Sequence, residues 1–507
     1  MKKISICKIR LFLCIAFIHW GITFYTDHFI FTITNERLWF YILIKICSFV
    51  LIVVIWKKIV DVITKCRKND KKTIQRLVYG CNYATILFLM LLAVWPGIWR
   101  TDEFGVLGNV ISLQIYWWQH FLTSIFYILS LMLIPNPVGV IIVQIILVSM
   151  GFGYLAELFE YRTGKKWSGF LLLLPFCIPS VIMFQLYPMR ITLYSILELV
   201  IAFFLYVHLQ DHKQIEWIHI IWLALGTAVL ANWRTESFYY IILLPLYFFC
   251  FLNKNILKQK QFIFYLTTVL ILSMSIWVIQ NKGLHNDRND AYEITAYAQS
   301  LPCLVQAAYN NHDENGLAVV NKIIDVDAVL QAKIEGKEGI ECFWEGDMSS
   351  KKYSHEEFNG FRKQYFIWCM QYYKEFFEER THNFLTSYEQ TKSTADLYDE
   401  ENLQFVFFLQ TFNHVNPLFP NLREKLILFM EQKKWCIFEI PIIMGIFSII
   451  YYLFKNKKYG LLWGMIFIRI PLIYLTAPDN YFMYYYPFLL AGIVISCFCF
   501  SDIFRKC

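Results

Sequence analysis

The chain has 507 residues, of which 57% are hydrophobic and 17% are charged. A soluble protein of this length would carry about 25% charged residues, and the apolar runs are long enough for a bilayer core about 30 Å thick, so an ordinary soluble protein is excluded. The net charge of +7 does not indicate nucleic-acid binding, because the excess Lys and Arg lie in short loops between apolar runs.

The first 280 residues are predicted to form an N-terminal transmembrane region. A basic N-terminus precedes an apolar run to about Tyr25, and a second apolar run covers 38–56. The loop 57–76 carries eight Lys or Arg residues, so the positive-inside rule places it in the cytoplasm. A third helix, over 78–95, would then bring segment 96–119 to the external surface.

The next part of the chain leaves two topologies open. Two apolar runs, 121–134 and 138–155, separate the external segment from Lys165 and Lys166, whose charge indicates a cytoplasmic position. Either the first run is a shallow or re-entrant helix, or these two lysines are an exception to the rule. We therefore expect about 11 to 13 membrane helices in an all-α, polytopic bundle.

Residues 281–435 differ in composition from the rest. They hold 16 Lys or Arg and 24 Asp or Glu residues, a local charge of −8 that leaves +15 for the remainder. A segment of this size can form its own core, so we expect a mainly helical extracytoplasmic domain. Residues 436–507 are expected to return as C-terminal transmembrane helices. This topology predicts a multi-pass protein of the cell membrane.

Candidate catalytic residues follow a Pro96-Gly97 turn. Asp102 and Glu103 lie five and six residues after Gly97, in segment 96–119. A carboxylate at the membrane surface could act as general base on a sugar hydroxyl or bind a divalent cation. The alternative is an ordinary pair of solvated loop carboxylates.

Further polar residues stand at predicted helix ends near the external face. Arg234 has a planar, permanently charged group suited to phosphate, although it could instead pair with Glu236. His120 follows an aromatic cluster and could equally be a satisfied structural histidine. The remaining candidates are Arg190, in the external turn 187–190, and Tyr485 and Tyr486, which could line a sugar or prenyl groove or belong to an interfacial aromatic belt.

At these positions the chain resembles the polytopic glycosyltransferases of the GT-C superfamily. The resemblance rests on Pro96-Gly97 with Asp102, on His120 at a helix start, on Arg234-Thr-Glu236, and on Tyr485-Tyr-Pro487. Each motif is short. The sequence departs from the family pattern at Phe121, where Pro is usual, and at Ser237, where Gly is usual.

The resemblance implies transfer of a sugar from a polyprenyl-phosphate donor to a glycan or lipid acceptor outside the membrane, with inversion at the anomeric carbon. Asp102, with Glu103, would provide the catalytic carboxylate. Arg234 and Arg190 would bind the donor phosphate, and His120, Glu236, Tyr485 and Tyr486 would line the substrate site. No cofactor is implied, and a divalent cation is left open.

Three other functions are compatible with the sequence. A polysaccharide polymerase or ligase also combines many helices with one large external segment. A lipid or polysaccharide transporter is the third possibility, although the sequence has no inverted repeat of the kind many transporters contain. The remaining alternative is a membrane scaffold without catalytic activity.

Overall fold

The computed structural model describes residues 2–116, 119–211, 213–251, 257–283, 294–337, 339, 342, 353–387 and 417–504. All regular elements within these ranges are helices, which confirms the expected all-α class. The chain divides into two compact units, considered separately below. The membrane unit comprises Met1–His285, Lys392–Ile466 and Tyr486–Cys507, and the inserted unit comprises Asn286–Thr391 and Phe467–Tyr485.

Eight described helical segments are long and apolar enough to cross a membrane, which is compatible with a multi-pass membrane protein. They are Asn35–Arg67, Lys71–Ala93, Val138–Thr163, Arg190–Asp211, Gln259–Asn281, Lys433–Lys455, Lys457–Thr476 and Tyr486–Phe504. The helices within them are α2 (Leu38–Arg67), α3 (Lys71–Ala93), α6 (Val138–Thr163), α9 (Arg190–Asp211), α12 (Gln259–Val278), α22 (Glu439–Lys455), α23 (Lys457–Phe467), α24 (Arg469–Thr476) and α25 (Tyr486–Phe504). Helix α1 (Lys2–Thr26) pairs with α2.

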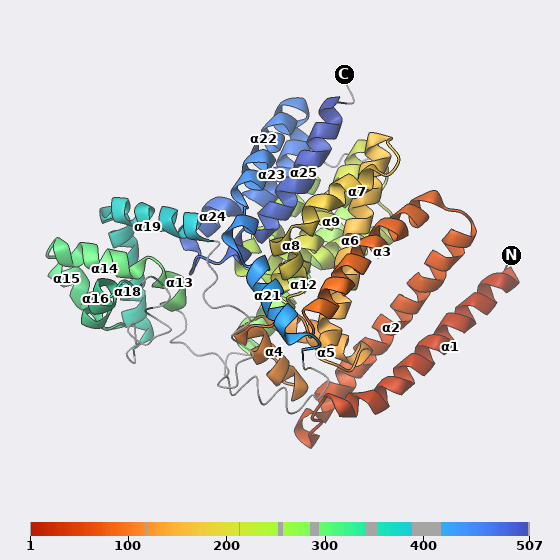
Figure 1. Ribbon diagram of the computed structural model, residues 1–507, viewed down its shortest axis with the longest axis horizontal. Helices are drawn as coiled ribbons and strands as arrows, with labels where there is room; N and C mark the ends of the chain where they lie inside the picture. The colour runs from red at the N-terminus through yellow and green to blue at the C-terminus, as the bar shows by residue number, and fades with distance from the viewer. Residues whose placement is uncertain are drawn as a thin grey trace. The chain divides into compact units, whose positions relative to one another are not determined.

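Small residues allow the closest helix pairs of the membrane unit to approach (Figure 1). A Cβ atom on Gly153 of α6 would lie 2.6 Å from the Arg76 carbonyl oxygen and 3.0 Å from Cα of Gly80, both on α3. A Cβ atom on Gly492 of α25 would lie 2.1 Å from the carbonyl oxygen of Pro441 on α22. Without a hydrophobic driving force inside lipid, such backbone contact is a main source of helix association.

Several apolar helices of the membrane unit are short. They are α5 (Phe121–Leu133), α10 (Trp217–Trp233) and α11 (Tyr240–Phe251). Helix α5 has 13 residues, so it is about 20 Å long, less than a bilayer core. This length favours the shallow or re-entrant alternative for 121–134. A bend of 84° between Ser168–Cys177 and Pro179–Gln185 marks a second broken or re-entrant span, formed by α7 (Ser168–Leu173) and α8 (Pro179–Gln185).

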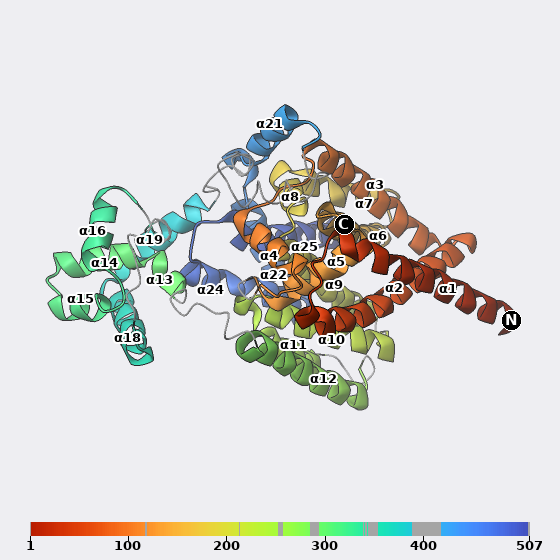
Figure 2. The ribbon, with the colours of Figure 1, turned by 90° about the horizontal axis from the view of Figure 1, so that it is seen from below.

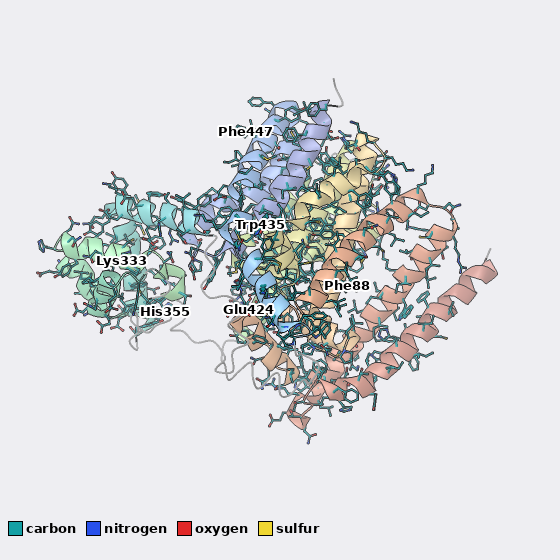
Figure 3. The ribbon with its side chains drawn as sticks, viewed as in Figure 1. Phe88, Lys333, His355, Glu424, Trp435 and Phe447 are labelled. Atoms are coloured by element: carbon teal, nitrogen blue, oxygen red, sulfur yellow. The ribbon has the colours of Figure 1, made fainter. Side chains whose placement is uncertain are left out.

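The inserted unit has a hydrophobic core of its own. Its helices are α13 (Thr295–Ala298), α14 (Leu301–Asn310), α15 (Glu314–Val320), α16 (Val326–Ile334), α18 (His355–Gln371) and α19 (Tyr373–Thr386), with α24 from the second segment. Fully buried Leu304, Ile323, Phe361 and Trp368 belong to one cluster. Ser354 begins α18 with a capping box to Glu357. Figure 3 shows His355 and Lys333 among the side chains of these helices.

One part of the range 281–435 groups with the membrane unit. Helix α21 (Pro420–Met430) packs against α8 and α3, and Figure 3 labels Glu424 on it and Trp435 just after it. Ser180 of α8 donates a hydrogen bond of 2.6 Å to the Trp435 carbonyl. The structural division therefore differs from the contiguous 281–435 domain expected from charge, and the side of the membrane on which either unit lies remains a prediction.

Candidate functional site

The Pro96-Gly97 turn fixes where α4 (Thr101–Ile111) begins. Gly97 has a φ of +102°, and a Cβ atom there would lie 2.1 Å from Cδ1 of Ile141, so glycine is required on both grounds. The Gly97 amide donates to the Val94 carbonyl at 2.9 Å. Trp99 is almost completely buried, with Nε1 donating to the Pro96 carbonyl at 3.2 Å.

Asp102 and Glu103 both lie in the first turn of α4, in different environments. Glu103 is only 2% exposed, and the Tyr187 hydroxyl donates a hydrogen bond to it. Burial, reinforced by the negative charge of Asp102, raises the pKa of Glu103 to about 8. Glu103 is therefore mostly protonated at neutral pH and inaccessible to a substrate.

Asp102 is half-buried and is held by the segment that follows α4. Gln119 donates from Nε2 to Oδ2 of Asp102 at 2.8 Å. The Tyr116 ring lies beside the same helix, since a Cβ atom on Gly105 would lie 3.2 Å from its Cζ. Burial, with the negative charges of Asp102 and Glu103, raises the pKa of the Tyr116 hydroxyl. Two adjacent carboxyl groups thus differ in burial, and different environments are how proteins separate the roles of paired carboxyls.

His120 caps α5 and does not act as a charged group. Its φ is +69°, and Nδ1 accepts from the Leu122 amide at 3.3 Å. Burial lowers the pKa of the imidazole to about 3, and the positive charge of Arg190 acts in the same direction. His120 is therefore neutral, and its ring caps the start of α5. It nevertheless lies close to Arg190, another of the candidates.

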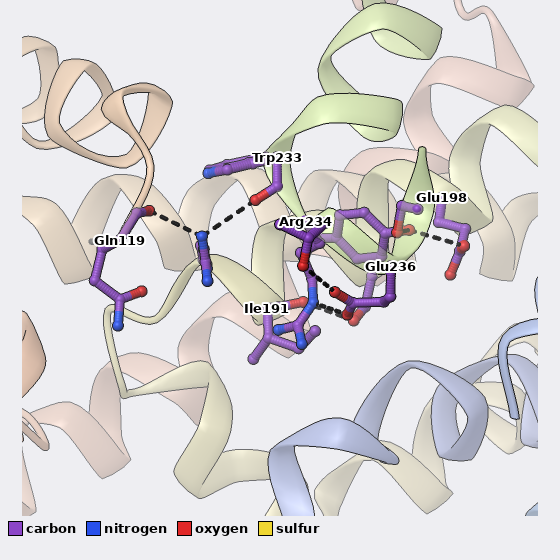
Figure 4. Close-up of polar contacts among 11 residues, drawn as sticks. Gln119, Ile191, Glu198, Trp233, Arg234 and Glu236 are labelled. Carbon is purple, nitrogen blue, oxygen red and sulfur yellow. Dashed lines mark hydrogen bonds and ion pairs between the residues drawn. The ribbon is translucent and has the colours of Figure 1, made fainter. Parts of the chain in front are cut away.

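Arg190 joins the segment after α4 to the end of α10. Its NH1 group donates to the Gln119 carbonyl at 3.1 Å and to the Trp233 carbonyl at 3.3 Å. Figure 4 shows these two carbonyls directed at one guanidinium. Trp233 is also fixed by its indole, which donates to the Thr123 hydroxyl at 2.9 Å. Arg190 thus brings the Asp102 and Arg234 segments together.

Arg234 and Glu236 form an ion pair in the turn that follows α10. Glu236 lies within the η4 turn (Thr235–Ser237), and Arg234 is the residue just before it. Figure 4 shows the two side chains facing each other. The Arg234 side chain is 7% exposed and that of Glu236 is 16% exposed. The pairing considered from sequence is therefore present, and it orients the guanidinium.

Helix α9 supports this turn with residues four positions apart. Arg190, Tyr194 and Glu198 share one helix face. The Tyr194 hydroxyl lies 2.7 Å from the Ser237 hydroxyl and donates to Glu198 at 3.2 Å. The Tyr240 hydroxyl donates to the same Glu198 oxygen. Glu198 is 2% exposed and lies close to the Arg234 turn in Figure 4.

The structure places the two tyrosine candidates in different units. Tyr486 begins α25 in the membrane unit and stacks on Phe184, with ring centroids 4.9 Å apart. Tyr485 belongs to the inserted unit and meets Phe384 edge-on at 5.1 Å. Both are almost completely buried. Of the predicted residues, Asp102, Glu103, His120, Arg190, Arg234 and Glu236 are connected within the membrane unit.

Several supporting residues were not found from sequence. They are Gln119, Tyr187, Glu198 and Arg423, whose guanidinium donates to the Gly97 carbonyl at 3.2 Å. The four-residue spacing of Arg190, Tyr194 and Glu198 along an apolar helix was a signal that could have identified Glu198, because an acidic residue inside a membrane helix is a functional candidate. The other three had no comparable signal.

The site combines carboxyl groups with guanidinium groups, and the described residues form no cluster of metal ligands. No three His, Cys, Asp or Glu side chains in those ranges are placed to hold a metal ion. The divalent cation left open by the sequence thus finds no ligand set in this part of the protein.

No protein-family model, curated protein or solved structure matches the chain in the three comparisons made.

Proposed function

We propose that the protein is a membrane glycosyltransferase that moves a sugar from a polyprenyl-phosphate donor to a hydroxyl group of an extracytoplasmic glycan or lipid. The observation that carries the proposal is the unequal pair on α4. Burial keeps Glu103 protonated, while Asp102 remains partly accessible with one oxygen held by Gln119. The pair thus supplies one carboxylate suited to accept a proton from an acceptor hydroxyl.

The second requirement is a cation for the leaving phosphate. Arg234 lies in a turn that Arg190 ties to the Gln119 segment through two carbonyls. Its partner Glu236 orients the guanidinium, and a phosphate would compete with that carboxylate for the same donors. A guanidinium is well suited to this exchange because its planar donors match phosphate oxygens in pairs.

The proposed reaction uses these groups in one displacement. Asp102 takes the proton of the acceptor hydroxyl, and the hydroxyl oxygen attacks the anomeric carbon. The bond from that carbon to the phosphate oxygen breaks, and its electron pair leaves with the polyprenyl phosphate. Arg234 stabilises the charge that grows on the phosphate in the transition state. Attack opposite the leaving group inverts the anomeric centre.

The roles of the other residues follow from their contacts. Glu103 and Gln119 position Asp102, since the first is buried and the second binds its carboxylate. Arg190 positions both segments, because it donates to a backbone carbonyl in each. We also propose that the protein crosses the cell membrane several times and that its inserted unit is extracytoplasmic. The expected total of about 11 to 13 membrane helices would then include some of the shorter apolar helices as well as the eight long ones among the described residues.

The proposal is tested by following label from donor to acceptor. Membranes containing the protein, and matched membranes without it, would receive a panel of polyprenyl-phosphate sugars labelled in the sugar. We expect one donor to lose its label to a lipid or glycan product, with release of polyprenyl phosphate, only when the protein is present. Inserted protein that consumes no donor in the panel would contradict the proposal.

A further inference from the structure

A buried ion pair joins α1 and α2 at some distance along the chain from the candidate site. Lys45 of α2 lies 2.6 Å from Oδ2 of Asp27, which begins the η1 turn (Asp27–Phe29) after α1. The side chains are 3% and 0% exposed. The Tyr41 hydroxyl donates to the same Asp27 oxygen at 2.8 Å, and Lys45 also donates to the Thr23 hydroxyl. One ion pair therefore fixes both helices and the start of the turn.

The pair is not needed simply to hold two apolar helices together. Replacing a buried ion pair with apolar groups is often neutral or stabilising, because desolvation of the charges offsets their attraction. Its partners meet in one geometry, however, so such a pair can specify one register. Aromatic contacts reinforce that geometry: Nζ of Lys45 lies 4.5 Å from the centroid of the Phe24 ring. Oδ1 of Asp27 has no hydrogen-bond partner in the described part of the chain.

The turn that begins at Asp27 reaches the helix that carries Asp102. Asp27 accepts backbone hydrogen bonds from Ile30 and Phe31 at 3.0 and 2.8 Å, and both of these residues are buried. The next amide, that of Thr32, donates to the carbonyl of Ile111 at 2.8 Å. Ile111 is the last residue of α4. Helices α1 and α2 also contact α5, which follows the Gln119 segment.

We propose that the Asp27–Lys45 pair is a clamp that seats the α1–α2 turn on the C-terminal end of α4, and so positions the helix bearing Asp102 and Glu103. Asp27 and Lys45 are positioning residues in this account, since neither contacts the candidate site. The clamp is a structural inference, whereas its importance for transfer rests on the proposed function. Figure 2, which is turned by 90° from Figure 1 and seen from below, shows α1, α2, α4 and α5 of this region.

Hydrogen exchange of the full-length protein in nanodiscs tests the clamp without any substrate. The variants are Asp27→Asn, Lys45→Met, the neutral double variant and the reversed pair Asp27→Lys with Lys45→Asp. The two single variants should exchange at least about tenfold faster in peptides covering 30–34, because each leaves a buried charge unpaired and local opening sets the exchange rate. The neutral double variant should also exchange faster there, because the turn loses the contact that fixes its geometry, even though no unpaired charge remains. The reversed pair should recover part of the protection.

A second, partly buried ion pair provides the control. Arg162 and Asp502 lie 2.8 Å apart at another place in the membrane unit, so Asp502→Asn should leave exchange over 30–34 unchanged. Unchanged exchange over 30–34 in the neutral double variant, which leaves no unpaired charge, would overturn the clamp. In the transfer assay, Asp27→Asn should lower kcat more than it raises KM for the donor. If no variant or parent transfers sugar, the proposed function fails while the exchange result still decides the clamp.

Discussion

Gln119 donates a hydrogen bond from Nε2 to Oδ2 of Asp102 at 2.8 Å, and its own carbonyl accepts from Arg190. One residue thus holds the proposed base and is held by the group that also binds the Trp233 carbonyl next to Arg234. Gln119 and Arg190 therefore connect the proposed base to the residue next to Arg234. Substitutions in this set of residues test how much the connection contributes to transfer.

Replacing Gln119 with leucine should reduce transfer by about tenfold or more, because Asp102 would lose the donor that fixes its orientation. The reduction should appear in kcat with little change in the donor KM. Gln114→Leu is the matched control, since Gln114 is exposed in the same segment. Initial rates in membranes with equal protein would decide the matter, and equal effects of the two substitutions would argue against a specific role for Gln119.

Glu103 should make the protein less stable as pH rises. Its folded-state pKa of about 8 lies above the ordinary value of 4.5, so the folded state binds the proton more tightly. This contribution is fully present below about pH 4.5 and is lost as pH rises toward 8, an effect on the order of a few kcal/mol.

Thermal unfolding in detergent between pH 5 and 8 measures this contribution. Glu103→Gln keeps the side chain neutral and should flatten the decline. Glu216→Gln removes an exposed carboxylate of the same unit and should leave the parent profile intact. A parent and a Glu103→Gln variant with the same slope would show that Glu103 is ionised in the folded protein.

Much of the architecture could be predicted because it depends on composition and local pattern. The all-α class and the candidate spans follow from apolar length, and the Pro96-Gly97 turn with its two carboxylates follows from local chemistry. The different burial of Asp102 and Glu103 could not be predicted, because Tyr187 and the side chains that bury Glu103 come from other parts of the chain. The separation of Tyr485 from Tyr486 and the grouping of α21 with the membrane unit likewise depend on tertiary packing.

Substituting Arg234 with lysine should raise the donor KM by roughly tenfold and leave part of kcat. Lysine keeps the charge but lacks the planar donors that match phosphate oxygens and Glu236. Lys213→Gln, which breaks the exposed pair with Asp211, should not change either constant. A normal donor KM in the lysine variant would remove Arg234 from the phosphate site.

The topology predicts opposite accessibility of two exposed positions. A cysteine replacing Asn310 in the inserted unit should react with a membrane-impermeant maleimide in intact cells, above the background of the native cysteines. A cysteine replacing Lys68, in the basic loop, should react only after permeabilisation. Both side chains are exposed. Ser350, another position suited to labelling in the acidic range 281–435, lies outside the described residues. The reverse pattern would invert the proposed orientation.

The most direct test of the account is the rate of sugar transfer by Asp102→Asn. The substitution keeps the size of the side chain and removes the base, which is typically worth about 10²–10⁴-fold in rate. With the active donor identified and protein levels matched, we expect transfer to fall below about 1% of the parent while Glu103→Gln retains a substantial fraction. Near-parental turnover by Asp102→Asn would contradict the assignment of the base, and with it the proposed mechanism.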